Sequence, residues 1–357
     1  MDLPRPHVNY EEYERIMQSG FARFPDRKEN YRRFMEKWGD CKLTEYSDTM
    51  PIKMDYESAS QCNFRCTMCQ LSDPDLKRPA NMTYDDFAKS IKGQYGLIEI
   101  KLQGIGEPLL NPELYKMIDL AVERDLWVRI ATNGSLLHLD DNYKKLVDHK
   151  VGEIQISVDG ATKDTFEKIR KGSDFDRVVE NATLINKYAQ SKGEGWRTSC
   201  WMLVQEENEH EVEKLLELAA KMNFTRLTYS IALSGWGSEK WEKINSPKER
   251  TGVFTDQLVK KLLERGDELG IEVTFWDVSE KFKWTPKRDQ ICAWPFSRAF
   301  ISSDMRIVPC CGVANSQTCD LGNAREFQEE WNNDAFRKMR KMHIDGTLPR
   351  MCRNCYE

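Results

Sequence analysis

Three cysteines, Cys62, Cys66 and Cys69, stand close together in the stretch CNFRCTMC. Thiolates spaced as C-x3-C-x2-C can ligate three irons of a [4Fe–4S] cluster and leave the fourth iron without a protein ligand. An iron left open in this way can bind a small molecule and pass an electron to it. The alternative is a structural zinc site, but zinc normally takes four closed ligands and no fourth cysteine follows nearby. The spacing therefore favours an iron–sulfur site.

A second set of cysteines lies near the end of the chain, arranged as C-x17-C, a long gap and then C-x2-C. Its members are Cys292, Cys310, Cys352 and Cys355. Four thiolates suit either a fully ligated [4Fe–4S] cluster or a four-cysteine zinc site, and the spacing alone leaves both open.

The remaining cysteines are Cys41, Cys200, Cys311 and Cys319. Cysteine is often a small buried hydrophobic residue, and we expect that role first for each of them. Cys311 and Cys319 are also candidates to replace a cluster ligand or to donate a hydrogen atom.

The elements that must position these residues follow an alternating pattern between residue 51 and about residue 276. Short strand-like and longer helix-like segments succeed one another, which predicts parallel strands with crossover helices in an α/β sheet or barrel. Such barrels build their sites from the loops after the carboxyl ends of the strands. The expected strands cover 52–58, 97–102, 127–131, 153–158, 198–204, 225–231 and 271–275. The expected helices cover 83–93, 112–124, 139–149, 162–170, 175–191, 209–221 and 249–269.

The two ends of the chain depart from this alternation. Residues 1–50 contain two charged, helix-like patches and predict a short N-terminal helical extension. Residues 277–357 are rich in cysteines and turns, with an expected hairpin in RAFISSDMRIVPCC and amphipathic helices after it. We interpret this tail as a small second domain that metal ligation stabilises.

Several motifs fall at the expected carboxyl ends of strands. In LQGIGEP, Gly104 and Gly106 flank Ile105 and allow a close backbone approach to a ligand, while Glu107 adds a carboxylate. The next two strand ends carry Thr132 and Asn133, in ATNGSLL, and Ser157 and Asp159, in ISVDGA. These side chains are expected at one mouth, although Asn133 and Asp159 are equally typical of turns and helix caps.

Taken together, these motifs resemble those of the radical S-adenosylmethionine (SAM) superfamily, from about residue 52 to residue 357. CNFRCTMC resembles its cluster loop, IGEP resembles its GGEP motif with Ile105 in place of a glycine, and ISVDG…IRKG resembles the signature of its SPASM/twitch subgroup. The resemblance implies a partial (βα)6 barrel, a [4Fe–4S] cluster whose free iron chelates SAM, and reductive cleavage of SAM to a 5′-deoxyadenosyl radical.

The resemblance also implies roles for individual residues. Met68 would face the adenine, Glu107 with the backbone of residues 104–106 would hold the SAM amino group, and Ser157 would contact the ribose or carboxylate. Further expected contacts to SAM are Thr132, Asn133, Asp159, Arg170 and Val204. Arg170, Cys311 and Cys319 are the candidates for a direct part in the reaction.

The tail resembles the twitch form of the SPASM domain. In that form Cys292, Cys310, Cys352 and Cys355 would hold one auxiliary [4Fe–4S] cluster. Such a cluster, fully ligated, cannot bind SAM and would instead accept or relay an electron.

Composition limits the partners. The chain of 357 residues has a net charge of −5, 40% hydrophobic and 31% charged residues, and no apolar run of transmembrane length. These values predict a cytoplasmic protein with no nucleic acid or membrane partner. Eleven cysteines without a secretory signal indicate metal binding rather than disulfides.

Three functional hypotheses follow. The first is a radical SAM enzyme that oxidises or epimerises a small polar substrate such as a sugar, aminocyclitol or nucleotide sugar. The alternative is a maturase that crosslinks or epimerises a ribosomally made peptide; residues 1–50 lack the strand–helix pattern of a leader-binding domain, which favours the first. The third is a non-catalytic iron–sulfur or zinc protein. An enzyme of either kind needs an electron donor such as flavodoxin or ferredoxin.

Overall fold

The computed structural model describes residues 3–40, 42–231, 233–250, 252–277, 291–353 and 355–356. Its main sheet contains seven consecutive parallel strands, and each overlaps a strand expected from the sequence, with ends that differ by at most two residues. They are β1 (Lys53–Tyr56), β3 (Glu99–Leu102), β4 (Trp127–Thr132), β5 (Glu153–Ser157), β7 (Thr198–Leu203), β8 (Arg226–Ser230) and β9 (Glu272–Trp276). The predicted α/β class is confirmed, and the strand order fits a partial barrel.

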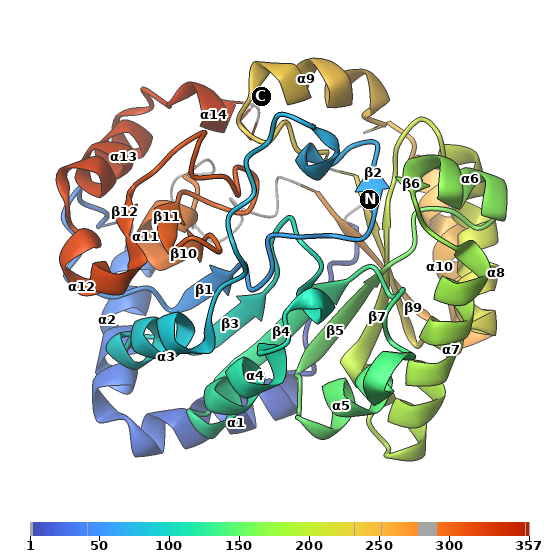
Figure 1. The fold of residues 1–357 in the computed structure, drawn as a ribbon, viewed down its shortest axis with the longest axis horizontal. Helices are drawn as coiled ribbons and strands as arrows, with labels where there is room; N and C mark the ends of the chain where they lie inside the picture. The colour runs from blue at the N-terminus through green and yellow to red at the C-terminus, as the bar shows by residue number, and fades with distance from the viewer. Residues whose placement is uncertain are drawn as a thin grey trace.

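Crossover helices pack along one side of this sheet (Figure 1). Three of the longest begin at N-caps that the sequence supplies: Thr83, Asp174 and Thr255 each accept a hydrogen bond from a backbone N–H of the first turn. These helices are α3 (Tyr84–Gly93), α4 (Leu114–Glu123), α5 (Asn142–Asp148), α6 (Lys163–Ile169), α7 (Phe175–Ser191), α8 (Val212–Lys221) and α10 (Asp256–Leu269). Helix α9 (Glu239–Asn245) lies instead at the top of Figure 1, where Asn245 donates to the Met68 carbonyl.

The two faces of the sheet differ in polarity because successive side chains of a strand point to opposite sides. On the helix-covered face, apolar side chains such as Met54, Ile100 and Val128 join the main core. The other face, called the inner face below, carries charged side chains on the first four strands. These are Lys53, Asp55, Glu99, Lys101, Arg129 and Glu153.

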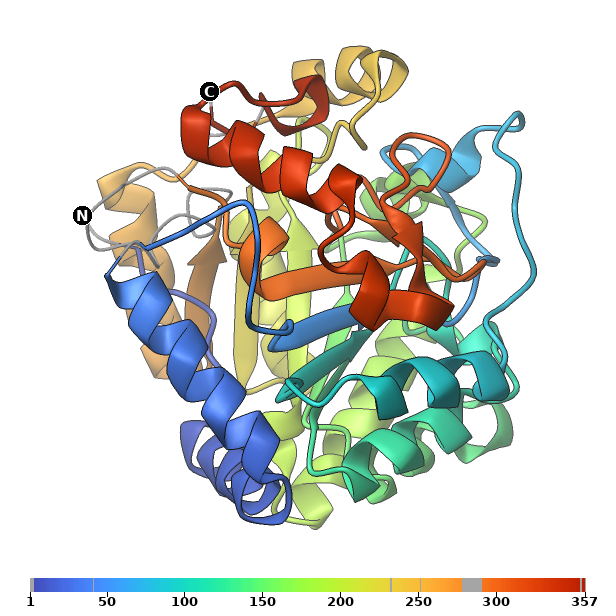
Figure 2. The same ribbon diagram turned by 90° about the vertical axis from the view of Figure 1, so that its left-hand side faces the viewer.

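The tail extends the same sheet. Strand β10 (Arg298–Ile301) pairs parallel with β1, and β11 (Arg306–Val308) and β12 (Gly322–Asn323) follow antiparallel, which confirms the expected hairpin. The tail helices are α11 (Trp294–Ser297), α12 (Phe327–Glu330), α13 (Asp334–Asp345) and α14 (Arg350–Arg353). In Figure 2 the tail helices α12 to α14 are red, and the N-terminal helices are blue; the two parts are in contact where Trp38 packs against Phe296 of the tail.

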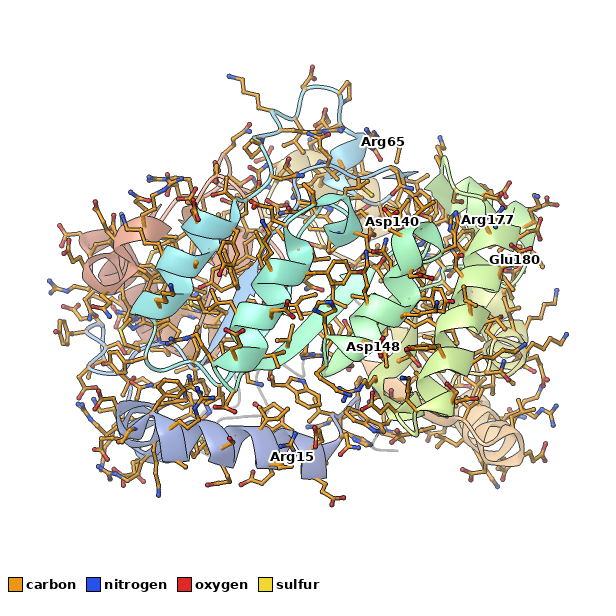
Figure 3. The ribbon with its side chains drawn as sticks, turned by 60° about the horizontal axis from the view of Figure 1, so that its bottom comes forward. Arg15, Arg65, Asp140, Asp148, Arg177 and Glu180 are labelled. Carbon is orange, nitrogen blue, oxygen red and sulfur yellow. The ribbon has the colours of Figure 1, made fainter. Side chains whose placement is uncertain are left out.

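The N-terminal extension forms α1 (Tyr10–Arg23) and α2 (Pro25–Gly39). Tyr13 of α1 packs edge-on against Trp127 at the start of β4, and its hydroxyl donates to Glu99 at the start of β3, 3.3 Å away. The extension therefore covers the amino ends of these strands. Arg15 on α1 and Arg65 in the cysteine loop lie at opposite ends of the molecule (Figure 3).

Cys200 is fully buried in the core of β7, as expected for a small hydrophobic residue. Cys41 lies outside the described residues. Within the described part of the chain, no helix has both the length and the apolar character needed to cross a membrane. The division of the chain at residues 50 and 276 stays a prediction.

Candidate active site

The loop after β1 carries the first three cysteines to the carboxyl edge of the sheet. Within it, the short strand β2 (Arg65–Cys66) pairs with β6 (Arg170–Lys171), so that Cys66 lies opposite Arg170. Burial raises the pKa of the Cys66 thiol to about 11, and the positive charge of Arg170 acts against that rise. Burial likewise raises the pKa of Cys69 to about 12, and the charges of Cys66 and Cys62 add to it. The three thiols therefore lie within electrostatic reach of one another.

Hydrogen-bond donors surround the first of these thiols. The backbone N–H of Phe64 lies 3.4 Å from the sulfur of Cys62, and the side-chain amide of Asn133 lies 3.7 Å from it. N–H groups directed at sulfur stabilise a thiolate, and thiols this buried lose their protons readily only when a metal binds them. The donor set fits a cluster held by three thiolates.

Glu107 connects this loop to the neighbouring strand ends. Its carboxylate is 2% exposed and accepts hydrogen bonds from the Thr132 hydroxyl (2.7 Å) and the backbone N–H groups of Asn133 (2.8 Å) and Leu109 (3.3 Å). Burial raises the pKa of this carboxyl group. Glu107, Thr132 and Asn133, three of the residues expected at one mouth, are thus in contact through hydrogen bonds.

The glycine at position 106 is required by a close backbone approach. A Cβ there would lie 1.9 Å from the carbonyl oxygen of Ala59, in the segment that leads to the cysteines. A Cβ at Gly104 would lie 2.4 Å from the side chain of Glu57. Glu57 in turn accepts the backbone N–H of Ile105 at 3.1 Å. Both glycines therefore allow the IGEP loop to pack closely against the segment between β1 and the cysteines, rather than against a ligand.

Asp159 and Arg170 form a buried ion pair. The guanidinium contacts the carboxylate from Nε at 2.8 Å and from Nη2 at 2.7 Å, and Asp159 is fully buried. The second carboxylate oxygen accepts the backbone N–H of Leu203 at 2.8 Å. Both carboxylate oxygens of Asp159 therefore have partners within the protein. The positive charge of Arg170 lies beside Cys66. By contrast, Ser157 is partly exposed at the end of β5.

The end of β7 contains an unpaired amide. Gln205 follows Val204, is fully buried, and neither its side-chain nitrogen nor its oxygen has a hydrogen-bond partner among the described residues. A buried amide without partners is costly and indicates a missing ligand with both donor and acceptor groups. An adenine edge has that character, so the strand ends fit a bound SAM.

The tail cysteines also gather at one place. Burial raises the pKa of the Cys352 thiol, and the charges of Cys310, Cys292 and Cys355 add to the rise, so the four sulfurs lie near one another. Four thiolates gathered at one place can fully ligate a [4Fe–4S] cluster.

Two residues brace the tail site in a way the sequence did not reveal. The backbone N–H of Cys292 donates to the Tyr356 hydroxyl oxygen at 2.8 Å, and that hydroxyl pairs with Nδ1 of His343, also at 2.8 Å. Burial lowers the pKa of His343 to about 4, so the ring is neutral and its Nδ1 accepts the tyrosine proton. The sequence predicts no role for any histidine.

A hydrogen-bonded bridge joins the two cysteine sites. The side-chain amide of Gln70, next to Cys69, donates to the Val313 carbonyl at 3.3 Å, and Asn315 donates back to Gln70 at 3.1 Å. Trp236, in the loop between β8 and α9, donates its indole N–H to the Met68 carbonyl at 3.0 Å. Trp236 also packs against a small hydrophobic cluster of the tail, against which Cys292, Cys310 and Cys311 pack as well.

Family comparisons agree with this geometry. The model of the Radical SAM superfamily matches residues 56–219, and the model of the SPASM iron–sulfur cluster-binding domain matches residues 292–356. The chain belongs to the radical SAM superfamily. Its SPASM tail places it in the SPASM/twitch subgroup. The cofactors of this subgroup are SAM, a SAM-binding [4Fe–4S] cluster and auxiliary iron–sulfur clusters.

Several radical SAM relatives are similar over much of the chain. The mycofactocin maturase MftC of Mycobacterium tuberculosis is 24% identical over 59% of this chain and 52% of its own length. The chain thus spans about half the length of that relative. The PqqA peptide cyclase of Granulibacter bethesdensis is 24% identical over 85% of this chain and 79% of its own.

Solved structures show the same fold. Streptococcus suis SuiB bound to its precursor peptide SuiA superposes with a TM-score of 0.64 at 14% identity, over 87% of this chain and 70% of SuiB. The structure of SuiB with bound S-adenosylmethionine superposes with a TM-score of 0.61 at 15% identity, over 82% of this chain and 68% of that one.

Proposed function

We propose that this chain is a radical SAM enzyme that modifies a peptide substrate with the help of an auxiliary cluster in its tail. The observation that carries the proposal is the bridge between the two cysteine sites, in which Gln70 and Asn315 bond across the gap from Cys69 to the tail. A reaction that needs both a radical source and a nearby electron acceptor requires two such sites in contact.

The substrate class rests on the relatives. Two of them carry names that specify peptide maturation, a mycofactocin maturase and a PqqA peptide cyclase. They favour the peptide alternative over the small polar substrate that the sequence suggested first. The lack of a leader-binding pattern in residues 1–50 is weaker support for the small molecule, because such a domain can be a separate protein.

The residues of the chain divide the work. When bound, the first cluster supplies the electron that cleaves SAM to methionine and the hydrogen-abstracting 5′-deoxyadenosyl radical. Cys62, Cys66 and Cys69 would hold that cluster, and Ser157 and Gln205 would contact SAM at the strand ends. The carboxylate of Glu107 would accept a hydrogen bond from the SAM amino group. The same carboxylate accepts hydrogen bonds from Thr132 and Asn133 and so positions both residues. Cys292, Cys310, Cys352 and Cys355 would hold the auxiliary cluster.

The test uses the full chain reconstituted anaerobically with iron and sulfide. It is incubated with SAM, dithionite and the small peptides encoded beside its gene, and the peptides are measured by mass spectrometry. We expect 5′-deoxyadenosine and a peptide that has lost two hydrogens or, in D2O, gained one deuterium.

The control is the variant in which Cys62, Cys66 and Cys69 are all alanine, which should form neither product. A parallel incubation contains sugars, aminocyclitols and nucleotide sugars. Turnover of one of these, with every peptide unchanged, would contradict the peptide proposal and restore the small-molecule hypothesis. SAM left intact by the loaded wild type would contradict both.

A further inference from the structure

Two opposite charges on the inner face lie side by side without forming an ion pair. Asp55 on β1 and Lys101 on β3 are direct partners in the strand register. Asp55 is only 8% exposed, and in the described part of the chain its carboxylate receives no hydrogen bond. The ammonium group of Lys101 makes a single hydrogen bond within that part, to the side-chain oxygen of Gln155 at 2.8 Å.

The other charges of this face show that the fold pairs charges where it can. Glu99 contacts Lys53 at 2.7 Å and Arg129 at 3.3 Å, and Arg129 also contacts Glu153 at 2.7 Å. Burying a carboxylate without an ion-pair partner is strongly unfavourable. Asp55 and Lys101 form no ion pair among the described residues, although the positive charges of Lys101 and Arg298 both act on Asp55. Such exceptions concentrate at functional sites.

The Asp55–Lys101 pair lies between the two cofactor sites. Two residues after Asp55 along β1, Glu57 accepts the backbone N–H of Ile105 in the IGEP loop. On the other side, strand β10 of the tail pairs with β1, and Phe300 of β10 is the register partner of Asp55. A substrate carbon that gives a hydrogen to the radical and an electron to the tail must sit between the same two sites.

We propose that Asp55 and Lys101 together bind one amide group of the substrate next to its reacting carbon. The amide carbonyl oxygen accepts a hydrogen bond from Lys101, and the amide N–H donates to Asp55. An amide carries one acceptor and one donor and no charge, so it satisfies both groups without leaving either charge uncompensated. The assignment rests on the proposed peptide substrate and names the group of the peptide that is recognised.

The test compares two ligands that differ only in the N–H group, N-benzylacetamide and its ester analogue benzyl acetate. Their affinities for the iron-loaded full chain are measured by saturation-transfer NMR. The proteins are wild type, Asp55→Asn, Lys101→Met and the control Thr228→Val. Thr228 lies on β8 of the same sheet, and its hydroxyl pairs with that of Thr274 at 2.8 Å. Iron content and thermal midpoint check that each variant folds.

We expect wild type and Thr228→Val to bind the amide at least about tenfold more tightly than the ester, because hydrogen bonds to charged groups are worth that much. Asp55→Asn should reduce the preference to about threefold or less, because Asp55 accepts the N–H that the ester lacks. Lys101→Met should weaken the binding of both ligands by about tenfold, because both carry the carbonyl oxygen that Lys101 binds. Equal binding of amide and ester by the wild type, a preference unchanged in Asp55→Asn, or affinities unchanged in Lys101→Met would overturn the proposal. Displacement of the amide by an equal concentration of myo-inositol would also overturn it, because the site would then recognise a polyol.

The result separates this inference from the proposed function. An amide preference in the wild type, with no peptide modified by the enzyme, would contradict only the proposed function. A peptide modified equally well by wild type, Asp55→Asn and Lys101→Met would contradict only the amide site.

Discussion

The indole N–H of Trp236 donates a hydrogen bond to the carbonyl oxygen of Met68, 3.0 Å away, while the same side chain packs against the small hydrophobic cluster of the tail that contains Trp294 and Phe300. One side chain thus contacts the cysteine loop and the core of the tail together. Its backbone lies in the left-handed region, with φ of 51°, which a tryptophan adopts only when its surroundings fix it.

Replacing Trp236 by phenylalanine should keep the ring packing and lose the hydrogen bond. A neutral hydrogen bond is worth about 1 kcal/mol, so we expect SAM affinity to fall about fivefold as the Met68 carbonyl loosens, with iron content unchanged. The measurement is SAM binding to the reconstituted protein. The matched control is Trp241→Phe on α9, where the tryptophan is buried and its indole makes no hydrogen bond to a described residue. An equal loss in both variants would mean that ring size matters, not the bond.

Removing the first three cysteine thiols should remove one cluster and leave the other. Wild type should hold about eight irons, and the variant with Cys62, Cys66 and Cys69 changed to alanine about four. Iron and sulfide analysis after anaerobic reconstitution measures this directly. Zinc in place of the remaining four irons would show that the tail cysteines bind a single ion, and would contradict their assignment to an auxiliary cluster.

Glu107→Ala should affect both stability and the first cluster. The sequence alone predicts weaker SAM binding with both clusters intact. The structure adds that Glu107 holds Thr132 and Asn133, and that Asn133 donates toward Cys62. Loss of the carboxylate leaves buried donors unpaired, so we expect a destabilisation of about 3 kcal/mol and slower assembly of the first cluster. Thermal unfolding and the rate of cluster absorbance growth measure the two effects.

The control for that variant is Glu123→Ala, a change at a glutamate at the end of α4 that is not part of the core. It should match the wild type in both measurements. A Glu107→Ala protein that assembles its clusters at the wild-type rate would separate Glu107 from the cysteine loop.

Acid should weaken the tail through His343. Its pKa is about 4 in the folded protein, because burial disfavours the charged ring, and about 6.5 when unfolded. The stability from keeping the ring neutral is present above pH 6.5 and is lost as the pH falls toward 4, by about 2 kcal/mol at pH 5. The thermal midpoint of auxiliary-cluster loss should therefore fall from pH 7 to pH 5 more in wild type than in His343→Gln. The glutamine oxygen can still accept the Tyr356 proton but does not titrate. Equal shifts in both proteins would exclude His343 as the cause.

Much of the fold could be predicted from the sequence because strands and helices alternate with distinct periods. All seven parallel strands overlap their expected positions, with ends that differ by at most two residues, and the charged patches of residues 1–50 predict both N-terminal helices. The pairing of β10 with β1 could not be predicted, since a four-residue strand carries no signal for its partner. That pairing is decided by contacts between distant segments, such as Glu57 accepting the backbone N–H of Ser303.

The candidate site could be predicted where side chains act through type and spacing, as the cysteines do. It could not be predicted where a residue acts through a partner brought by the fold. Asp159 is an example, because its pairing with Arg170 depends on the short β2–β6 contact. The Asp55–Lys101 pair was visible only as polar positions alternating with apolar ones in KMDYE and EIKL, a pattern that does not tell which strands are neighbours.

The parallel pairing of β10 with β1 also constrains the order in which the protein can be made. Glu57 must wait for Ser303, a residue 246 positions later, to leave the ribosome. Until then one edge of β1 has no partner strand. Long-range pairing of parallel strands is slow, and an unpaired strand edge promotes aggregation. Because the loop that carries Cys62 follows β1 directly, we expect that loop to reach its final position only after the tail has been synthesised.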